Sequence, residues 1–456
     1  MYQTSILSQK AKNPFIAGTL ILTITGLASR MIGFFYRIFL SRTFGEENIG
    51  IYQLISPVMA LVFSLSAAGF QNAISKFVAG KAAIHDYKAS LRILLVGFGF
   101  SFAASLLCMV TVFSFSDFLA ERLLFEARCA PLLRVAALSF PFASVHSCIN
   151  GYFYGVRKTA VPASSQLVEQ VFRVGSVYFI TVSAQKNGQE PSLLVASAGL
   201  CIGEMASMIL SLLAAYAYFS RNLSRKYTAA SPTRCESYAQ LSCQILGFSM
   251  PLCANRLCLN ILQAIEAACT PAKLQVYGYS VSESLSVYGV LTGMALPLIF
   301  FPGTITNSVS VLLMPAISEA DSLNNRRVIK RAVRRCLSFC LGFGGICSFL
   351  FLCLGKYIGI FLFDSELAGN FIIILGFMCP FLYLNTTLTS ILHGLGKTGY
   401  SFFLNMASLM LRLFFVFYAV PLYGIKGYLI GMLLSQLLNT LCCLLPLRQY
   451  WVPGRA

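Results

Sequence analysis

Residues 18–40 read GTLILTITGLASRMIGFFYRIFL, an almost wholly apolar stretch. A helix needs about 20 consecutive apolar residues to cross the hydrocarbon core of a bilayer, so this stretch predicts a membrane-spanning helix. Two arginines, Arg30 and Arg37, stand inside it. Because a charged side chain within a membrane is energetically costly, the two arginines indicate a specific role.

The rest of the chain has the same apolar character. Of its 456 residues, 57% are hydrophobic and 11% are charged, and the mean hydropathy is +0.74. This composition cannot cover a water-soluble fold, so it predicts an all-α polytopic membrane protein. A window of about 20 residues predicts about 12 transmembrane helices, near residues 15–41, 48–75, 91–115, 132–155, 162–183, 192–219, 241–268, 285–317, 336–355, 368–392, 400–420 and 424–447.

The basic residues are distributed unequally between the two sides of the membrane. Of 34 Lys and Arg, 21 lie at the termini and in the loops on the same side, 8 lie in the opposite loops, and 5 lie inside the spans. Positive loops stay in the cytoplasm, so both termini are expected to be cytoplasmic. Topology and anionic lipids also account for the net charge of +18, and no nucleic-acid partner is expected.

An internal repeat divides the chain. Pro141, Phe142, Gly155, Lys158, Thr159 and Arg173 recur at a constant offset of 239 as Pro380, Phe381, Gly394, Lys397, Thr398 and Arg412. A weaker similarity links residues 73–75 to residues 316–318 with an offset of 243. Six spans intervene, so the halves share one orientation, as in transporters built from two lobes. We predict a first lobe at 1–225, a cytoplasmic linker at 226–240 and a second lobe at 241–456, with a duplicated scaffold that does not transport as the alternative.

Motifs of enzymes are not found. Residues 396–398 read Gly-Lys-Thr, but the phosphate-binding loop needs a glycine at position 391, which is Ile391. The three histidines, at 85, 146 and 393, have no metal-ligand spacing, and the 16 cysteines lie mostly in apolar runs. We therefore expect no catalytic residues, no metal site and no cofactor. We expect an interior histidine such as His146 to be hydrogen-bonded.

Arg30 and Arg37 are expected to project from one helical face. Seven residues correspond to about 20° around the axis and about 10 Å along it. Guanidinium groups stay charged in a membrane and bind phosphate oxygens with a planar fork of donors, so the pair suits a diphosphate. Two alternatives are an ion pair with Glu169, Glu204 or Glu266, and, for Arg37, extension of the side chain to the membrane interface.

The seventh span is unusually polar, with Asn255, Arg256, Asn260, Gln263 and Glu266. Arg256, Asn260 and Gln263 share a helical face, which must look into protein or water. We predict Arg256 as a third ligand of the anionic group, facing Arg30 across a cavity, with a structural ion pair as the alternative. The other four polar residues are candidates for lining the cavity or for ion coupling.

Charged residues also stand in later spans. Glu169 and Arg173 are four apart on one helix and predict a structural pair. Glu204 has no partner nearby in the sequence and is a candidate coupling group. Arg412 repeats Arg173, but Ser408 replaces the acid, so its partner must come from another helix.

Two stretches resemble a known family. The first comprises Gly18 to Leu20, Ser29 to Phe34, Arg37, residues 44–46 and residues 50–52; the second comprises Tyr288 to Pro297, Pro302, residues 306–308 and residues 315–320. They resemble the stage V sporulation protein B and polysaccharide-biosynthesis family of the multidrug/oligosaccharidyl-lipid/polysaccharide exporter superfamily. The resemblance implies a MATE-like fold of two six-helix lobes in a bacterial plasma membrane.

The resemblance also implies a function, namely alternating-access flipping of an undecaprenyl-pyrophosphate-linked saccharide such as a lipid II-type precursor. Related lipid II flippases share Ser29, Arg30, Gly33 and Phe34, whereas Arg37 comes one residue later than in those relatives. Partners would be the lipid-linked oligosaccharide, membrane lipids and cell-wall synthesis enzymes. Transport would be driven without a cofactor, by membrane potential, H⁺ or Na⁺.

Two other functions are open. A cation-coupled multidrug antiporter of the same superfamily would be expected to have an acidic cavity, whereas the spans hold five arginines and three glutamates. A non-transporting scaffold for wall or spore assembly would use the same charges only for assembly.

Overall fold

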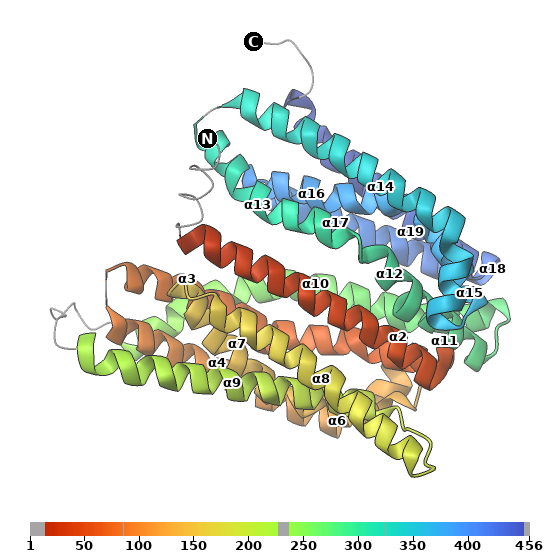
Figure 1. Ribbon diagram of the computed structural model, residues 1–456, viewed down its shortest axis with the longest axis horizontal. Helices are drawn as coiled ribbons and strands as arrows, with labels where there is room; N and C mark the ends of the chain where they lie inside the picture. Colours follow the sequence, from red (N-terminus) through yellow and green to blue (C-terminus); the bar gives the residue numbers. More distant parts are fainter. Residues whose placement is uncertain (1–13, 85, 227–236, 324, 451–456) are drawn as a thin grey trace. The chain divides into compact units, whose positions relative to one another are not determined.

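The computed structural model describes residues 14–84, 86–226, 237–323 and 325–450 (Figure 1). All regular elements in these ranges are helices, which confirms the all-α class. The predicted linker, 226–240, lies largely in residues 227–236, outside the described part. Lys10 and Lys12, which are the basic residues of the N-terminus in the topology count, also lie outside the described residues.

The elements follow one another with short connections. The longer helices are α2 (Pro14–Phe63), α3 (Gly69–Ala83), α4 (Tyr87–Ser114), α6 (Cys129–Ala137), α7 (Ser139–Gly155), α8 (Ala160–Lys186), α9 (Leu194–Lys226), α10 (Tyr238–Tyr277), α11 (Val281–Gly289), α13 (Gly303–Ser322), α14 (Arg326–Phe363), α15 (Glu366–Gly376), α16 (Cys379–Gly394), α17 (Thr398–Phe414) and α19 (Ile425–Leu444). Short helices are α5 (Ser116–Phe118), α12 (Leu296–Phe300), α18 (Val420–Tyr423) and a 3-10 helix at Leu445–Tyr450, and π-helical turns lie at Ser64–Ala68, Leu119–Leu123, Val290–Ala295 and Phe415–Ala419.

The predicted number of membrane spans can be compared with the helices of the structure. Within the described residues, eight helices are long and apolar enough to cross a membrane, or ten if two bent pairs each count as one span, so the count of about twelve is not confirmed. One of the eight, Ile21–Ala83, is 63 residues long and leaves helical geometry at Gly45 (φ 78°, ψ 175°). The 27-residue α8 is not among the eight, because Glu169, Gln170 and Arg173 lower its hydropathy.

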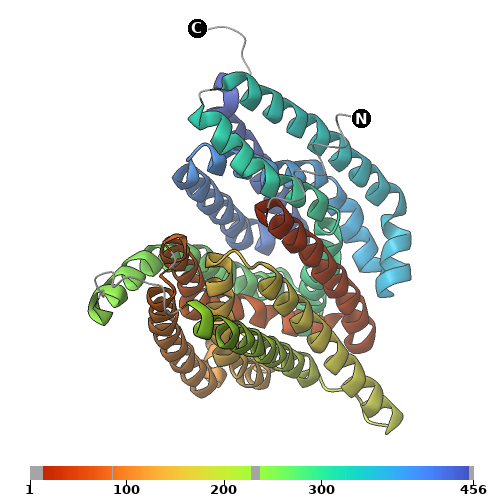
Figure 2. The same cartoon turned by 60° about the vertical axis from the view of Figure 1, so that its left-hand side comes forward.

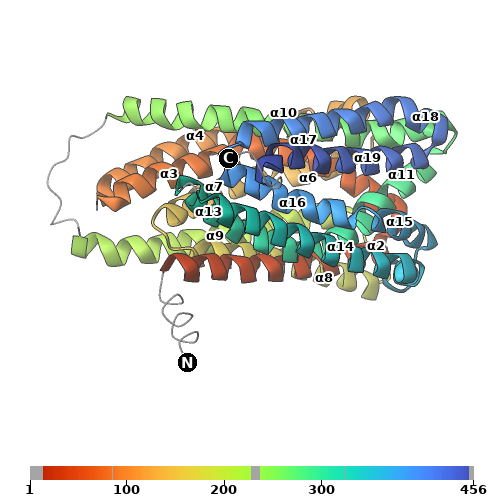
Figure 3. The same ribbon diagram turned by 90° about the horizontal axis from the view of Figure 1, so that it is seen from above.

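The chain packs as two compact units. One comprises residues 1–36 and 55–260, and the other comprises 37–54 and 261–456, so both α2 and α10 are shared between units. In the first unit α3, α4, α7 and α9 pack together and α8 lies along α9 (Figure 2). In the second, α13 and α14 lie along α16, which also contacts α19 (Figure 3).

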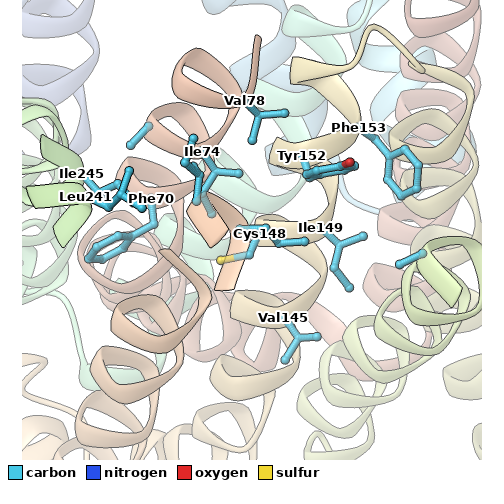
Figure 4. Packing of buried hydrophobic residues seen from close by; sticks show 14 residues of the cluster. Phe70, Ile74, Val78, Val145, Cys148, Ile149, Tyr152, Phe153, Leu241 and Ile245 are labelled. Atoms are coloured by element: carbon cyan, nitrogen blue, oxygen red, sulfur yellow. The ribbon is translucent and has the colours of Figure 1, made fainter. Parts of the chain in front are cut away.

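The core of the first unit forms where α3 crosses α7. Ile74 and Val78 of α3 face Cys148 and Tyr152 of α7, and all four are buried (Figure 4). Such close packing of apolar side chains is the main favourable term that holds the helices in register. In the second unit a similar cluster joins α13, α14 and α16.

The repeat is visible in helix caps. Asp86 begins α4 and accepts a hydrogen bond from the amide of Ala89 at 2.9 Å. Asn325, at the equivalent position of the repeat, begins α14 and accepts from the amide of Val328 at 3.3 Å. Each cap satisfies an amide that the helix leaves without a partner.

Close helix contacts also repeat. A Cβ on Gly155 would lie 2.9 Å from the Ser75 carbonyl oxygen, and one on Gly394 would lie 2.7 Å from that of Met314. Ser75 and Met314 have the same offset of 239 as the two glycines. The offset of 243 predicted from residues 73–75 and 316–318 is therefore wrong for this contact. Four residues make about one helical turn, so a similar triplet recurred one turn away on the same face.

Two predicted spans are bent. Residues 132–155 fall on α6 and α7, which meet at 40°, and residues 368–392 fall on α15 and α16, which meet at 57°. Pro141 and Pro380 lie in the first turns of α7 and α16. Proline lacks an amide hydrogen and is accommodated in a first turn, where helices leave amides unbonded, so the repeated proline favours a new helix at this point.

Candidate functional site

The predicted pair on α8 is the start of a charged cluster. Arg173 Nη2 donates to Glu169 Oε1 at 2.5 Å, the contact expected from their spacing. Each of the two side chains is only 16% exposed. The pair therefore sits among helices rather than on an open surface.

Helix α9 adds Glu204 to this pair. Glu204 Oε1 lies 3.6 Å from Arg173 Nη2, and Glu204 Oε2 forms a 2.6 Å hydrogen bond with His146 Nε2 of α7. Helix α9 can approach because Gly203 has no side chain: a Cβ there would lie 2.8 Å from the Glu169 carbonyl oxygen. Sequence reasoning treated His146 and Glu204 separately, and the structure joins them.

The cluster has the spacing of a metal site but not its charge. One ligand atom each from His146, Glu169 and Glu204 lies within 4.8 Å of the other two. The Arg173 guanidinium contacts both carboxylates, at 2.5 and 3.6 Å. It supplies the positive charge that a metal ion would bring and would repel such an ion, so we assign no metal to this cluster.

A second buried ion pair lies in the other unit. Arg412 Nη2 is 2.9 Å from Glu266 Oε2, and the Tyr428 hydroxyl donates to Glu266 Oε1 at 2.9 Å. Glu266 is 5% exposed. The partner of Arg412 thus comes from another helix, α10, as the missing acid at Ser408 requires.

The second unit also has a counterpart of the contact between His146 and Glu204. Asn385, which occupies the position of His146 in the repeat, donates from Nδ2 to Gln436 Oε1 at 2.7 Å. Gln436 and Glu204 have matching positions, because the residue before each of them makes the same helix contact. In the second unit this residue is Ser435, whose carbonyl accepts from Ser408 Oγ at 3.3 Å. In the first unit Gly203 takes the same place against Glu169, the repeat equivalent of Ser408.

The polar residues of α10 have different surroundings. Asn260 donates from Nδ2 to Ser64 Oγ at 2.7 Å and to the Ala60 carbonyl at 3.1 Å. Asn255, Arg256 and Gln263 are exposed. Asn260 therefore fixes α10 to the π-helical turn at Ser64–Ala68, and the predicted cavity roles of these residues stay predictions.

Arg30 and Arg37 of α2 are exposed, as is Arg256 of α10. Glu169, Glu204 and Glu266 pair with Arg173, His146 and Arg412 in the described part of the chain. The alternative in which Arg30 or Arg37 pairs with one of these glutamates stays a prediction. Binding of an anionic headgroup by the three arginines stays a prediction.

Comparison with known proteins agrees with this architecture. The family described as "Polysaccharide biosynthesis protein" matches residues 15–321, and the family described as MatE matches residues 274–418. Stage V sporulation protein B of Bacillus subtilis (strain 168) is 29% identical over 437 residues, which cover 94% of this chain and 83% of that protein.

Solved structures show the same fold. Lipid II flippase MurJ in its inward closed conformation has a TM-score of 0.69 at 14% identity, covering 94% of this chain and 87% of that chain. An inward-facing multidrug resistance MATE family transporter of the MOP superfamily has a TM-score of 0.67 at 15% identity, covering 94% and 97%. The chain therefore belongs to the polysaccharide biosynthesis protein family.

Proposed function

We propose that the chain is an alternating-access flippase for undecaprenyl-pyrophosphate-linked saccharides, with a lipid II-type precursor as its cargo. Its relatives include a sporulation protein and a lipid II flippase, which supports a cargo for the cell wall or the spore cortex. We place it in the bacterial plasma membrane with both termini in the cytoplasm, in contact with membrane lipids and with the enzymes of cell-wall synthesis.

The observation that carries the proposal is the balance of charge inside the helices. Five arginines stand inside the predicted spans against three glutamates, and each of these three glutamates pairs with Arg173, His146 or Arg412. The predicted spans therefore carry a net positive charge. A transporter for cations would be expected to have the opposite balance.

Arg30, Arg37 and Arg256 are the proposed ligands of the pyrophosphate. Their side chains are exposed rather than buried in helix packing. A guanidinium group donates two parallel hydrogen bonds to phosphate oxygens and keeps its charge in a medium of low dielectric constant. In this proposal the isoprenoid tail stays in lipid while the two lobes rock around the headgroup.

The test is flipping of a fluorescent lipid II-type precursor by the purified protein in vesicles. Arg30→Ala removes charge-assisted hydrogen bonds worth about 1.5–3 kcal/mol, so flipping should fall by roughly 10- to 100-fold. Arg122→Ala is the matched control, because Arg122 is an exposed arginine of the π-helical turn at Leu119–Leu123. Equal rates for the two variants would contradict the proposal.

The same vesicles separate the alternatives. A multidrug antiporter would move a cationic dye in exchange for H⁺ or Na⁺, and the wild-type protein should not do so here. A non-transporting scaffold would move neither dye nor precursor.

A further inference from the structure

The two units make the same helix contact with different chemistry. His146 of α7 meets Glu204 of α9 at 2.6 Å, and Asn385 of α16 meets Gln436 of α19 at 2.7 Å. His146 and Asn385 are equivalent by the offset of 239, and Gln436 takes the place of Glu204 in the helix contact. The imidazole of the first contact can gain or lose a proton, whereas the two amides of the second contact cannot.

Counting charges shows which protonation state makes the first cluster neutral. When Glu169 and Glu204 are both ionised and Arg173 carries one positive charge, the cluster is neutral if the imidazole of His146 is protonated. A net charge is costly among side chains that are 10–16% exposed. In the second unit, Glu266 and Arg412 balance each other, and no proton is needed.

Asn150 can supply a hydrogen-bond acceptor for the protonated imidazole of His146. Nε2 is already used by Glu204, so a second proton goes on Nδ1. Asn150 lies 3.4 Å away with its amide nitrogen toward Nδ1, and its Oδ1 is buried with no hydrogen-bond partner among the described residues. If the amide oxygen and nitrogen exchanged places, Oδ1 would accept from a protonated Nδ1 and also from Ser165, whose hydroxyl is 3.3 Å from the amide nitrogen.

We propose that His146, Glu204 and Asn150 form a proton-binding site in the first unit, and that its counterpart in the second unit does not bind a proton. One proton passes from water to His146 Nδ1, where it forms an N–H bond, and returns to water when it leaves. Building on the flippase function proposed above, this site couples transport to the proton gradient.

The groups that act on His146 are Glu204 of α9 and Glu169 and Arg173 of α8. The thiol of Cys201 lies near Glu204 on α9. Helices α3 and α4, which also pack on α7, add no charged group to the cluster in the part that is described, and Arg134 of α6 pairs with Asp117 at 2.5 Å.

Loss of the proton would weaken the contact between α7 and α9. When the imidazole loses its proton, the hydrogen bond from Nε2 to the Glu204 carboxylate loses the attraction between opposite charges. Without the proton, the cluster also keeps one net negative charge. The protonation state of His146 therefore biases how tightly α7 holds α9.

The first arm of the test needs no transport. In protein with isotope-labelled histidine, NMR in lipid should show an imidazole that changes protonation between pH 5 and 8 and that is absent in His146→Asn. Glu204→Gln should move the midpoint of this titration by about 1 pH unit or more, whereas His393→Asn should leave it unchanged. The proposed proton site would be overturned if the titration midpoint did not change in Glu204→Gln, or if it moved when NaCl replaced choline chloride.

The second arm measures flipping under an imposed pH gradient. The double variant His146→Asn/Glu204→Gln copies the amide pair of the second unit, so it should fold, and its flipping should lose its response to the gradient. An unchanged response would overturn the coupling. If the wild-type protein does not flip the precursor at all, the proposed function fails, and the first arm still decides the proton site.

Discussion

The pair between Glu266 and Arg412 predicts a strong and non-additive effect on stability. Glu266 is 5% exposed and accepts hydrogen bonds from Arg412 and Tyr428, both at 2.9 Å. Removing one member of a buried pair costs about 3–5 kcal/mol, because the other charge stays buried without compensation. Since the Arg412 side chain keeps 18% exposure, we expect Glu266→Gln to lose about 3 kcal/mol of unfolding free energy.

The double variant Glu266→Gln/Arg412→Gln tests the reason for this loss. It removes both charges, so its cost should be smaller than the sum of the two single changes by about 2 kcal/mol or more. The assay is equilibrium unfolding of the purified protein in mixed micelles. Lys356→Gln is the control, because Lys356 pairs with Glu366 at 2.7 Å but both side chains are more than half exposed, and we expect no measurable loss. Single changes that simply add would refute the reasoning.

Three more predictions follow from packing, capping and charge. Gly203→Val should lower the unfolding free energy by about 1–3 kcal/mol, because a Cβ at this position would lie 2.8 Å from the Glu169 carbonyl oxygen. Gly175→Ala on α8 should not lower it, because a Cβ there would have open space. Equal losses in the same unfolding assay would contradict this prediction. Asp86→Ala and Asn325→Ala should each cost about 1 kcal/mol, since each side chain caps a helix; a loss at only one site would show that the caps are not equivalent. Cytoplasmic reporters fused to either end should be active and periplasmic reporters inactive, and the reverse at either end would overturn the predicted orientation.

Local signals in the sequence predicted much of the fold. The apolar spans gave the all-α membrane class, and the repeat from Pro141 to Arg173 gave two similar halves. The bends at Pro141 and Pro380 were not predicted as interruptions of spans, whereas the break at Gly45 lies between the predicted spans 15–41 and 48–75. A hydropathy window averages over such residues, so it cannot separate one straight helix from two that meet at an angle.

The charged site was harder to predict because its contacts join different helices. The pair on α8 followed from a spacing of four residues, whereas the contact of Glu204 with His146 depends on how α9 packs on α7. One signal was available: the repeat places Asn385 at the position of His146 and so marks a titratable residue in only one half. The partner of Arg412 required a fold, since Glu266 is far away in the sequence and stands on α10.

The central claim is that the cargo carries a lipid-linked anionic headgroup. The most direct measurement compares transfer of a fluorescent lipid II-type precursor with transport of a cationic dye by the wild-type protein in the same vesicles. We predict that the protein makes inner-leaflet precursor accessible from outside and leaves the dye where it was. Movement of the dye without movement of the precursor would contradict the account.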